Sequence, residues 1–156
     1  MNRNNKMDSH AEYILHNAAR WRLDFFDSQK GGYLVVDNER IEQSKVNKQE
    51  MEKYKKEYNM CLTLAQNGYK VEYLKMTENS FDIYLNGIST ELKKTTSHNN
   101  LVDYAKKAVN KQEAKLVVFE LETMNAETMK EMLKLKVMNI PVKYYLTNDK
   151  THIIDL

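Results

Sequence analysis

The sequence predicts an α/β fold in which a mixed central sheet is flanked by helices. Segments with the 3.6-residue apolar spacing of helices alternate along the chain with short apolar runs rich in β-branched and aromatic residues. The dipeptide Asn86-Gly87 lies between two runs of alternating polarity. It is a strong short signal for a β-hairpin, because both residues tolerate positive φ. We expect one main domain over 31–156, preceded at 1–30 by a polar tail and an amphipathic helix.

Length and composition narrow the class of protein. The chain has 156 residues, enough for one substantial core, and its net charge of +2 gives no global basic excess that demands nucleic acid. Lysines cluster locally, although such runs are more often plain solvated surface. The single Cys61 excludes an internal disulfide and a cysteine-based zinc site. We find no signal peptide or membrane-spanning run, so we expect a cytoplasmic protein without a membrane partner.

The first expected element is a helix that begins at a cap on Asp8 or Ser9 and runs to about Phe26. This helix, over about 8–27, carries an unusual share of the aromatic side chains. We therefore expect it to dock on the main domain, on a second copy as a homodimer, or on another partner.

The other elements follow from periodicity and turn residues. Gly68 is a typical stop for the helix before it, and the run LVVFEL is typical of a strand buried on both faces. The connection after the first strand, through Asn38, is polar and we expect no regular structure there. Besides the hairpin, we predict helices at 47–67, 101–113 and 126–138, and strands at 33–36, 70–74, 116–121, 141–146 and 152–156.

The Asn86-Gly87 turn fixes a register for the hairpin. It places Asp82 directly opposite Glu91, with Cβ atoms about 4.5–5.5 Å apart, and Lys93 two residues further along the same face. Like charges in this position destabilise a sheet, and Mg²⁺ between them would remove the repulsion, since it is held by one or two carboxylates, water and phosphate. The ordinary alternative is a solvated polar face on which Lys93 neutralises Glu91.

Glu57 borders the apolar stripe of the helix at 47–67. A carboxylate pointing toward the edge of a core is costly unless it has a cation or hydrogen-bond donors. The ordinary alternative to a functional role is an ion pair with Lys53, four residues earlier on the same helix.

The predicted order of elements, with an acid before the hairpin turn and E-x-K after it, resembles the PD-(D/E)xK nuclease superfamily. Phe81 stands where that family usually has proline. The resemblance implies a restriction-endonuclease-like core of order α-β-β-β-α-β, here with an extra N-terminal helix. It implies catalytic roles for the residues that match the family's motif and active-site positions, which are Glu57, Asp82, Glu91, Lys93 and Gln112.

A narrower resemblance covers roughly residues 31–147. The segments GGYLVVDNERI, KKEYNMCLTLAQNGYKVEYL and DIYLNGISTELKKTTSHNNLVDYAKKA are similar to C-terminal nuclease domains of bacterial contact-dependent inhibition toxins. Similar domains also end some phage-head-like proteins of mobile elements. The toxin domains that this chain resembles cleave tRNA, so the resemblance implies tRNA or other structured RNA as the favoured substrate and an immunity protein as a partner. It does not cover the helix at 8–27.

The implied mechanism is metal-assisted phosphodiester hydrolysis. Asp82, Glu91 and Glu57, with the Leu92 carbonyl, would hold Mg²⁺ or Mn²⁺, and Lys93 would orient the attacking water or meet the developing charge. The candidates for contact with nucleic acid are Lys94, Thr95, Ser97, His98 and Lys106.

Each polar candidate has an ordinary alternative. Thr95 and Ser97 suit turn and N-cap chemistry before the next helix, and His98 suits an exposed turn. Gln112 suits a surface amide at a helix end.

Three functions stay open from the sequence. The first is a metal-dependent nuclease acting on tRNA or structured RNA. The second is the same chemistry on DNA, as in mobile-element or restriction nucleases. The third is a non-catalytic module that binds nucleic acid or protein, and the presence of the complete set Glu57, Asp82, Glu91 and Lys93 argues against it.

Overall fold

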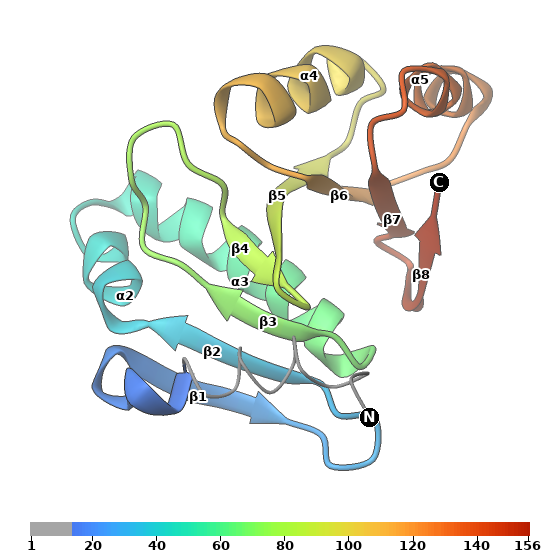
Figure 1. Cartoon of the computed structure of the whole chain (residues 1–156). Coiled ribbons are helices and arrows are strands. Elements are labelled where there is room, and N and C mark those ends of the chain that lie inside the picture. The colour runs from blue at the N-terminus through green and yellow to red at the C-terminus, as the bar shows by residue number, and fades with distance from the viewer. Residues whose placement is uncertain (1–13) are drawn as a thin grey trace. The chain divides into compact units, whose positions relative to one another are not determined.

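The computed structural model describes residues 14–156, and the chain folds as two compact units (Figure 1). Of the described residues, the first unit comprises 14–76 together with Tyr84–Ile88, and the second comprises Thr77–Ile83 and Ser89–Leu156. The domain boundary that we expected at residue 30 stays a prediction. No helix within residues 14–156 is long and apolar enough to cross a membrane.

The first unit contains three paired strands. Strand β2 (Tyr33–Asp37) lies antiparallel to β1 (Trp21–Phe26) and parallel to β3 (Lys70–Tyr73). A short 3-10 helix, η1 (Ala18–Arg20), precedes β1. The chain turns back from β1 to β2 through two backbone hydrogen bonds between Asp27 and the glycine pair that follows it, of 2.8 and 2.9 Å.

The expected helix is therefore wrong over residues 21–26, and its part at 8–13 lies outside the described residues. The physical reason is a period of two: Trp21, Leu23 and Phe25 alternate with polar residues, and aromatic side chains favour strands. The homodimer through this helix stays a prediction. On β1, Leu23 and Phe26 are 63% and 62% exposed.

Two helices complete the first unit. Helix α3 (Lys48–Gln66) was expected: the side chain of Asn47 accepts a hydrogen bond from the Glu50 amide (2.8 Å), and Gly68 follows with φ +94°. Helix α2 (Asn38–Ser44) was missed. Its signal was the preceding Asp37, an N-cap residue whose carboxylate accepts a hydrogen bond from the Glu39 amide at 2.9 Å.

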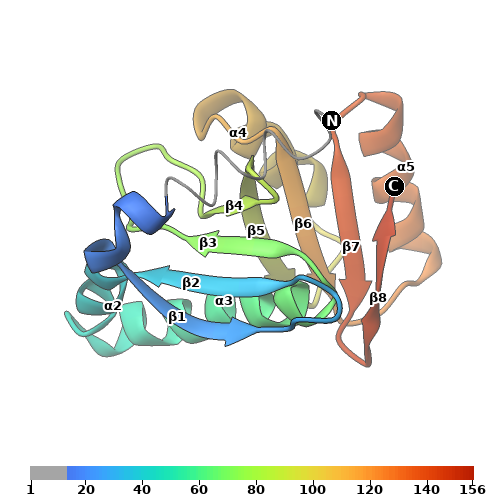
Figure 2. The ribbon, with the colours of Figure 1, turned by 60° about the horizontal axis from the view of Figure 1, so that its bottom comes forward.

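Helix α3 lies along one face of this sheet and buries apolar side chains against β2 and β3 (Figure 2). The buried apolar residues of these elements are Leu34, Val35, Val36, Met60, Cys61, Leu64, Ala65, Val71 and Tyr73.

The second unit holds three consecutive parallel strands and one antiparallel strand. Strands β5 (Ile88–Thr95), β6 (Leu116–Leu121) and β7 (Val142–Leu146) pair in parallel, and β8 (Asp149–Asp155) runs antiparallel to β7. All of β6 is buried, as the continuous apolar run predicted.

Helices α4 (Leu101–Lys111) and α5 (Ala126–Val137) cover one face of the second unit's sheet (Figure 1). Their buried side chains join those of β6 and β7 in one core. The core consists of Leu101, Ala105, Ala108, Ala114, Val117, Phe119, Leu121, Met132, Leu135 and Val142.

The predicted hairpin turn is confirmed. Strand β4 (Ile83–Leu85) and β5 flank Asn86 and Gly87, which have φ values of 49° and 82°. From α3 to β6 the elements follow one another as helix, three strands, helix and strand.

Gly31 and Gly32 form a matched pair for testing the packing of the first unit. A Cβ on Gly32 would lie 2.0 Å from the Ala65 carbonyl oxygen, a backbone atom that cannot turn aside, whereas a Cβ on Gly31 meets nothing within 4 Å. Gly31 has φ +79°, so Gly31→Ala carries only the left-handed penalty of about 1–2 kcal/mol. We predict that Gly32→Ala costs about 4 kcal/mol or more. Urea unfolding followed by circular dichroism measures both, and equal midpoints would contradict the packing described here.

Candidate functional site

Both polar groups of the Leu92 backbone, in the middle of β5, bond to side chains. The Leu92 N–H donates to Oδ2 of Asp82 at 2.9 Å, and the Leu92 carbonyl accepts from the Tyr104 hydroxyl at 3.1 Å. Strand β4 begins only at Ile83, so Asp82 lies just outside the regular strand. These two side chains satisfy backbone groups that a longer partner strand would otherwise bond.

The register predicted for Asp82 is wrong. The Asp82 amide donates to the Thr90 carbonyl at 3.1 Å, one residue away from the expected partner Glu91. Aspartate side chains compete for backbone amides, and here the carboxylate bonds to the Leu92 amide where the ladder becomes irregular. Asp82 therefore reaches β5 through its side chain, and not as the cross-strand neighbour of Glu91.

Glu91 and Lys93 lie on the face of β5 that helix α4 covers. Their partners on β6 are Val117 and Phe119, which belong to the core shared with α4. Glu91 is buried, with 2% of its surface exposed. Lys93 is exposed, and its Nζ lies 4.9 Å from the ring centroid of Tyr104 on α4. The E-x-K pair thus combines a buried carboxylate with an ammonium held over an aromatic ring.

Gln112 is the C-cap residue of α4. Its side-chain Oε1 is buried and has no hydrogen-bond partner among residues 14–156. The next residue, Glu113, accepts a hydrogen bond from the Ser89 hydroxyl through its carbonyl (3.2 Å), and the Lys115 amide donates to the Ser89 carbonyl (2.8 Å). This end of α4 therefore lies beside β5, two residues before Glu91.

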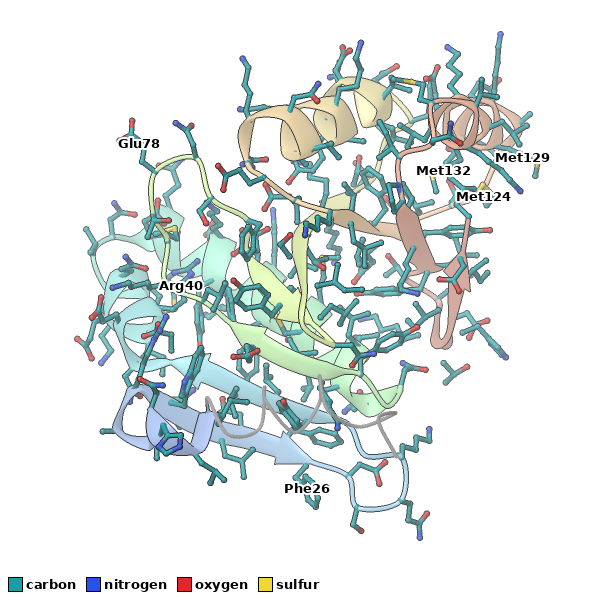
Figure 3. All side chains as sticks on the ribbon, in the orientation of Figure 1. Phe26, Arg40, Glu78, Met124, Met129 and Met132 are labelled. Atoms are coloured by element: carbon teal, nitrogen blue, oxygen red, sulfur yellow. The ribbon has the colours of Figure 1, made fainter. Side chains whose placement is uncertain are left out.

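Glu57 lies in the first unit, within a set of contacts of its own. Its Oε1 accepts a hydrogen bond from the Tyr73 hydroxyl at 2.7 Å and lies 3.4 Å from Nη2 of Arg40. Arg40 extends from α2 and is fully buried (Figure 3). Its guanidinium lies 5.3 and 5.2 Å from the ring centroids of Tyr54 and Tyr73. Burial, followed by the nearby Glu57 carboxylate, raises the pKa of Tyr73, so this hydroxyl is a neutral donor.

This arrangement gives Glu57 a different cation from the one expected. Lys53 has its Nζ 3.7 Å from Sδ of Met76, and the charge beside Glu57 comes from Arg40, on the helix that the sequence did not reveal. A buried ion pair often contributes little to stability, because desolvation offsets the attraction. We therefore attribute to the pair the orientation of the Glu57 side chain. The catalytic and metal-binding roles expected for Glu57 stay predictions.

The residues expected to contact nucleic acid lie in several settings. Thr95 and Ser97 serve the turn after β5: the Thr95 hydroxyl donates to the Ser97 carbonyl (2.8 Å) and accepts from the Ser97 amide (3.2 Å). Asn100, with φ 67°, is the N-cap position of α4. His98 is half-buried, and Lys106 is exposed on α4.

Lys94 lies on the sheet face opposite Glu91 and Lys93, because side chains alternate along β5. Its Nζ is 3.3 Å from Oε2 of Glu120, a buried carboxylate in the middle of the sheet. Glu120 also accepts hydrogen bonds from the hydroxyls of Tyr145 (2.8 Å) and Thr147 (2.9 Å). Burial alone would raise the pKa of Glu120, but these two donors and the Lys94 charge lower it. Lys94, although exposed, is thus the ion-pair partner of a buried carboxylate on the other face from the candidate site.

The polar groups described above around β5 include oxygen donors, the kind of ligand that a hard cation such as Mg²⁺ or Mn²⁺ prefers. These oxygen donors are the carboxylates of Asp82 and Glu91, the Leu92 carbonyl and the unpartnered Oε1 of Gln112. Within residues 14–156, no group of three His, Cys, Asp or Glu side chains has a geometry that could hold a metal ion.

The Glu120 contacts predict a pH-dependent effect of Tyr145→Phe. Because the folded pKa of Glu120 is lowered from 4.5, its stabilising contribution is present above about pH 4.5 and is lost as the pH falls through the folded pKa. Removing the Tyr145 hydroxyl should lower the free energy of unfolding by about 1.5–3 kcal/mol at pH 7, and by progressively less as the pH falls through the folded pKa of Glu120 and its carboxyl becomes protonated. Urea unfolding at a series of pH values from 7 downward measures this. Tyr144→Phe, on the neighbouring residue, is the control, and a Tyr145→Phe effect independent of pH would contradict the assignment.

The fold is similar to that of a chain of known structure. No protein-family model matches the chain, and no curated protein matches it. A chain in the solved structure of the CdiA-CT/CdiI toxin and immunity complex from Burkholderia pseudomallei is similar in structure, with a TM-score of 0.53 and 16% sequence identity. The match covers 72% of this chain and 89% of that chain. At this identity the likeness concerns the fold, and this protein therefore shares its fold with a chain of that toxin and immunity complex.

Proposed function

We propose that this protein is a metal-dependent endonuclease of the toxin type, with tRNA or another structured RNA as its substrate. Asp82, Glu91 and Lys93 are the proposed catalytic residues, and Gln112 assists them. The observation that carries the proposal is the hydrogen bond from the Leu92 amide to Asp82 Oδ2, which ties one carboxylate to the segment that holds the other and the lysine.

The chemistry of the side chains supports hydrolysis of a phosphodiester. A divalent cation bound by Asp82 and Glu91 would neutralise charge on the phosphate as a Lewis acid. Lys93 supplies a fixed positive charge for the oxygens of the transition state. Glu91, as a buried carboxylate, is suited to binding a hard cation, and the Gln112 carboxamide can accept a hydrogen bond from the attacking water.

The likeness to a chain of a toxin and immunity complex supports the biological part of the proposal. On this proposal an immunity protein would bind the chain and block its activity. The preference for RNA over DNA rests on the sequence resemblance, so the substrate has to be tested directly.

The test is cleavage by the purified full chain of total tRNA and of supercoiled plasmid, each with Mg²⁺ and with EDTA. We predict cleavage of tRNA with Mg²⁺ and none with EDTA. Asp82→Asn and Glu91→Gln should each reduce the rate by more than about 100-fold, because each removes a negative charge that would hold the divalent cation. Asparagine at 82 can still accept the bond from the Leu92 amide, so the fold should survive.

Glu127→Gln is the matched control, since Glu127 is an exposed carboxylate in the first turn of α5. Cleavage of plasmid with tRNA left intact would favour the DNA nuclease alternative. Glu91→Gln protein with the full rate would refute the assignment of the site.

A further inference from the structure

Tyr104 makes two contacts with the E-x-K segment of β5. Its hydroxyl donates to the Leu92 carbonyl at 3.1 Å, and its ring centroid lies 4.9 Å from Nζ of Lys93. The ring also meets Phe119, with the two centroids 6.2 Å apart. One side chain of α4 therefore touches two consecutive residues of the strand that carries the proposed catalytic lysine.

We propose that Tyr104 is a positioning residue of the site, one that fixes both the Lys93 ammonium and the Leu92 carbonyl. This inference rests on the proposed nuclease function. Tyr104 acts through its neighbours and needs no contact with the substrate.

The ring fixes Lys93 by a cation–π interaction. Lys93 is exposed, and a lysine side chain on a sheet surface otherwise samples many rotamers. The negative face of an aromatic ring attracts the ammonium and narrows that range. A charge already in place when the transition state forms stabilises it without reorganisation, so the ring should affect the rate of the chemical step more than the binding of RNA.

The hydroxyl fixes the peptide group between Leu92 and Lys93 through the Leu92 carbonyl. The Leu92 N–H bonds to the Asp82 carboxylate, and the Leu92 carbonyl bonds to Tyr104, so the peptide groups on both sides of Leu92 are anchored by side chains. Loss of the hydroxyl should loosen this anchor while leaving the ring and its contacts with Lys93 and Phe119 in place.

Two variants separate the functions of ring and hydroxyl. Tyr104→Phe keeps the ring and loses the hydrogen bond, and Tyr104→Leu keeps apolar bulk and loses both. Tyr144→Leu is the matched control, because Tyr144 is a half-buried tyrosine that packs against the same core from β7.

The first readout is nuclear magnetic resonance of the metal-free protein, which does not depend on activity. The ring should shift the ε-methylene proton signals of Lys93 upfield in the wild type and in Tyr104→Phe. In Tyr104→Leu these signals should move to the position of an unstructured lysine, and in Tyr144→Leu they should stay at the wild-type position. Unchanged Lys93 signals in Tyr104→Leu would overturn the inference.

The second readout is the kinetics of tRNA cleavage. We expect Tyr104→Leu to lower kcat by about fivefold or more with KM nearly unchanged. Tyr104→Phe should recover most of this loss, and Tyr144→Leu should retain the wild-type kcat.

The outcomes separate the inference from the proposed function. Wild-type protein that cleaves tRNA, with Tyr104→Leu equally fast, would overturn the positioning role alone. Wild-type protein that cleaves neither tRNA nor plasmid would overturn the proposed function and the positioning role with it.

Discussion

The hydrogen bond from the Leu92 amide to the Asp82 carboxylate, 2.9 Å long, organises the candidate site of the second unit. It exists because β4 begins at Ile83 whereas β5 continues to Thr95, so β5 has backbone groups beyond the end of its neighbour. A carboxylate and a tyrosine hydroxyl satisfy those groups at Leu92. The contacts that complete the hydrogen bonding of β5 therefore also bring an acid and an aromatic ring to Leu92, next to Lys93.

Each of the two units contains a buried charged side chain that is held by its own set of partners. In the first unit Arg40 meets Glu57 and the rings of two tyrosines. In the second unit Glu120 is held by Lys94, Tyr145 and Thr147 on the sheet face opposite Lys93. A buried ion pair contributes little net free energy to folding, but removing one partner leaves a buried charge and destabilises the protein strongly. Each pair therefore constrains the orientation of its two side chains. Charge at an internal position is thus by itself weak evidence of catalysis here.

Much of the fold could be predicted from local patterns. The Asn86-Gly87 turn, the buried run of β6 and the caps of α3 depend on neighbouring residues alone. The failures lay elsewhere: Trp21–Phe26 has the alternation of a strand and pairs with β2, although its aromatic content also suits a helix face. Helix α2 has only seven residues, too few for the helical spacing of apolar residues to be recognised. For the candidate site, the motif identified Asp82, Glu91 and Lys93. Tyr104 lies in the predicted helix at 101–113, but a helical pattern cannot show which strand that helix meets.

The most direct test of the central claim is a crystal structure of the protein soaked with Mn²⁺, with the ion located by its anomalous scattering. The account predicts one strong peak within about 2.5 Å of carboxylate oxygens of both Asp82 and Glu91. A fully bound ion elsewhere, or the two carboxylates turned away from each other with no peak between them, would contradict it.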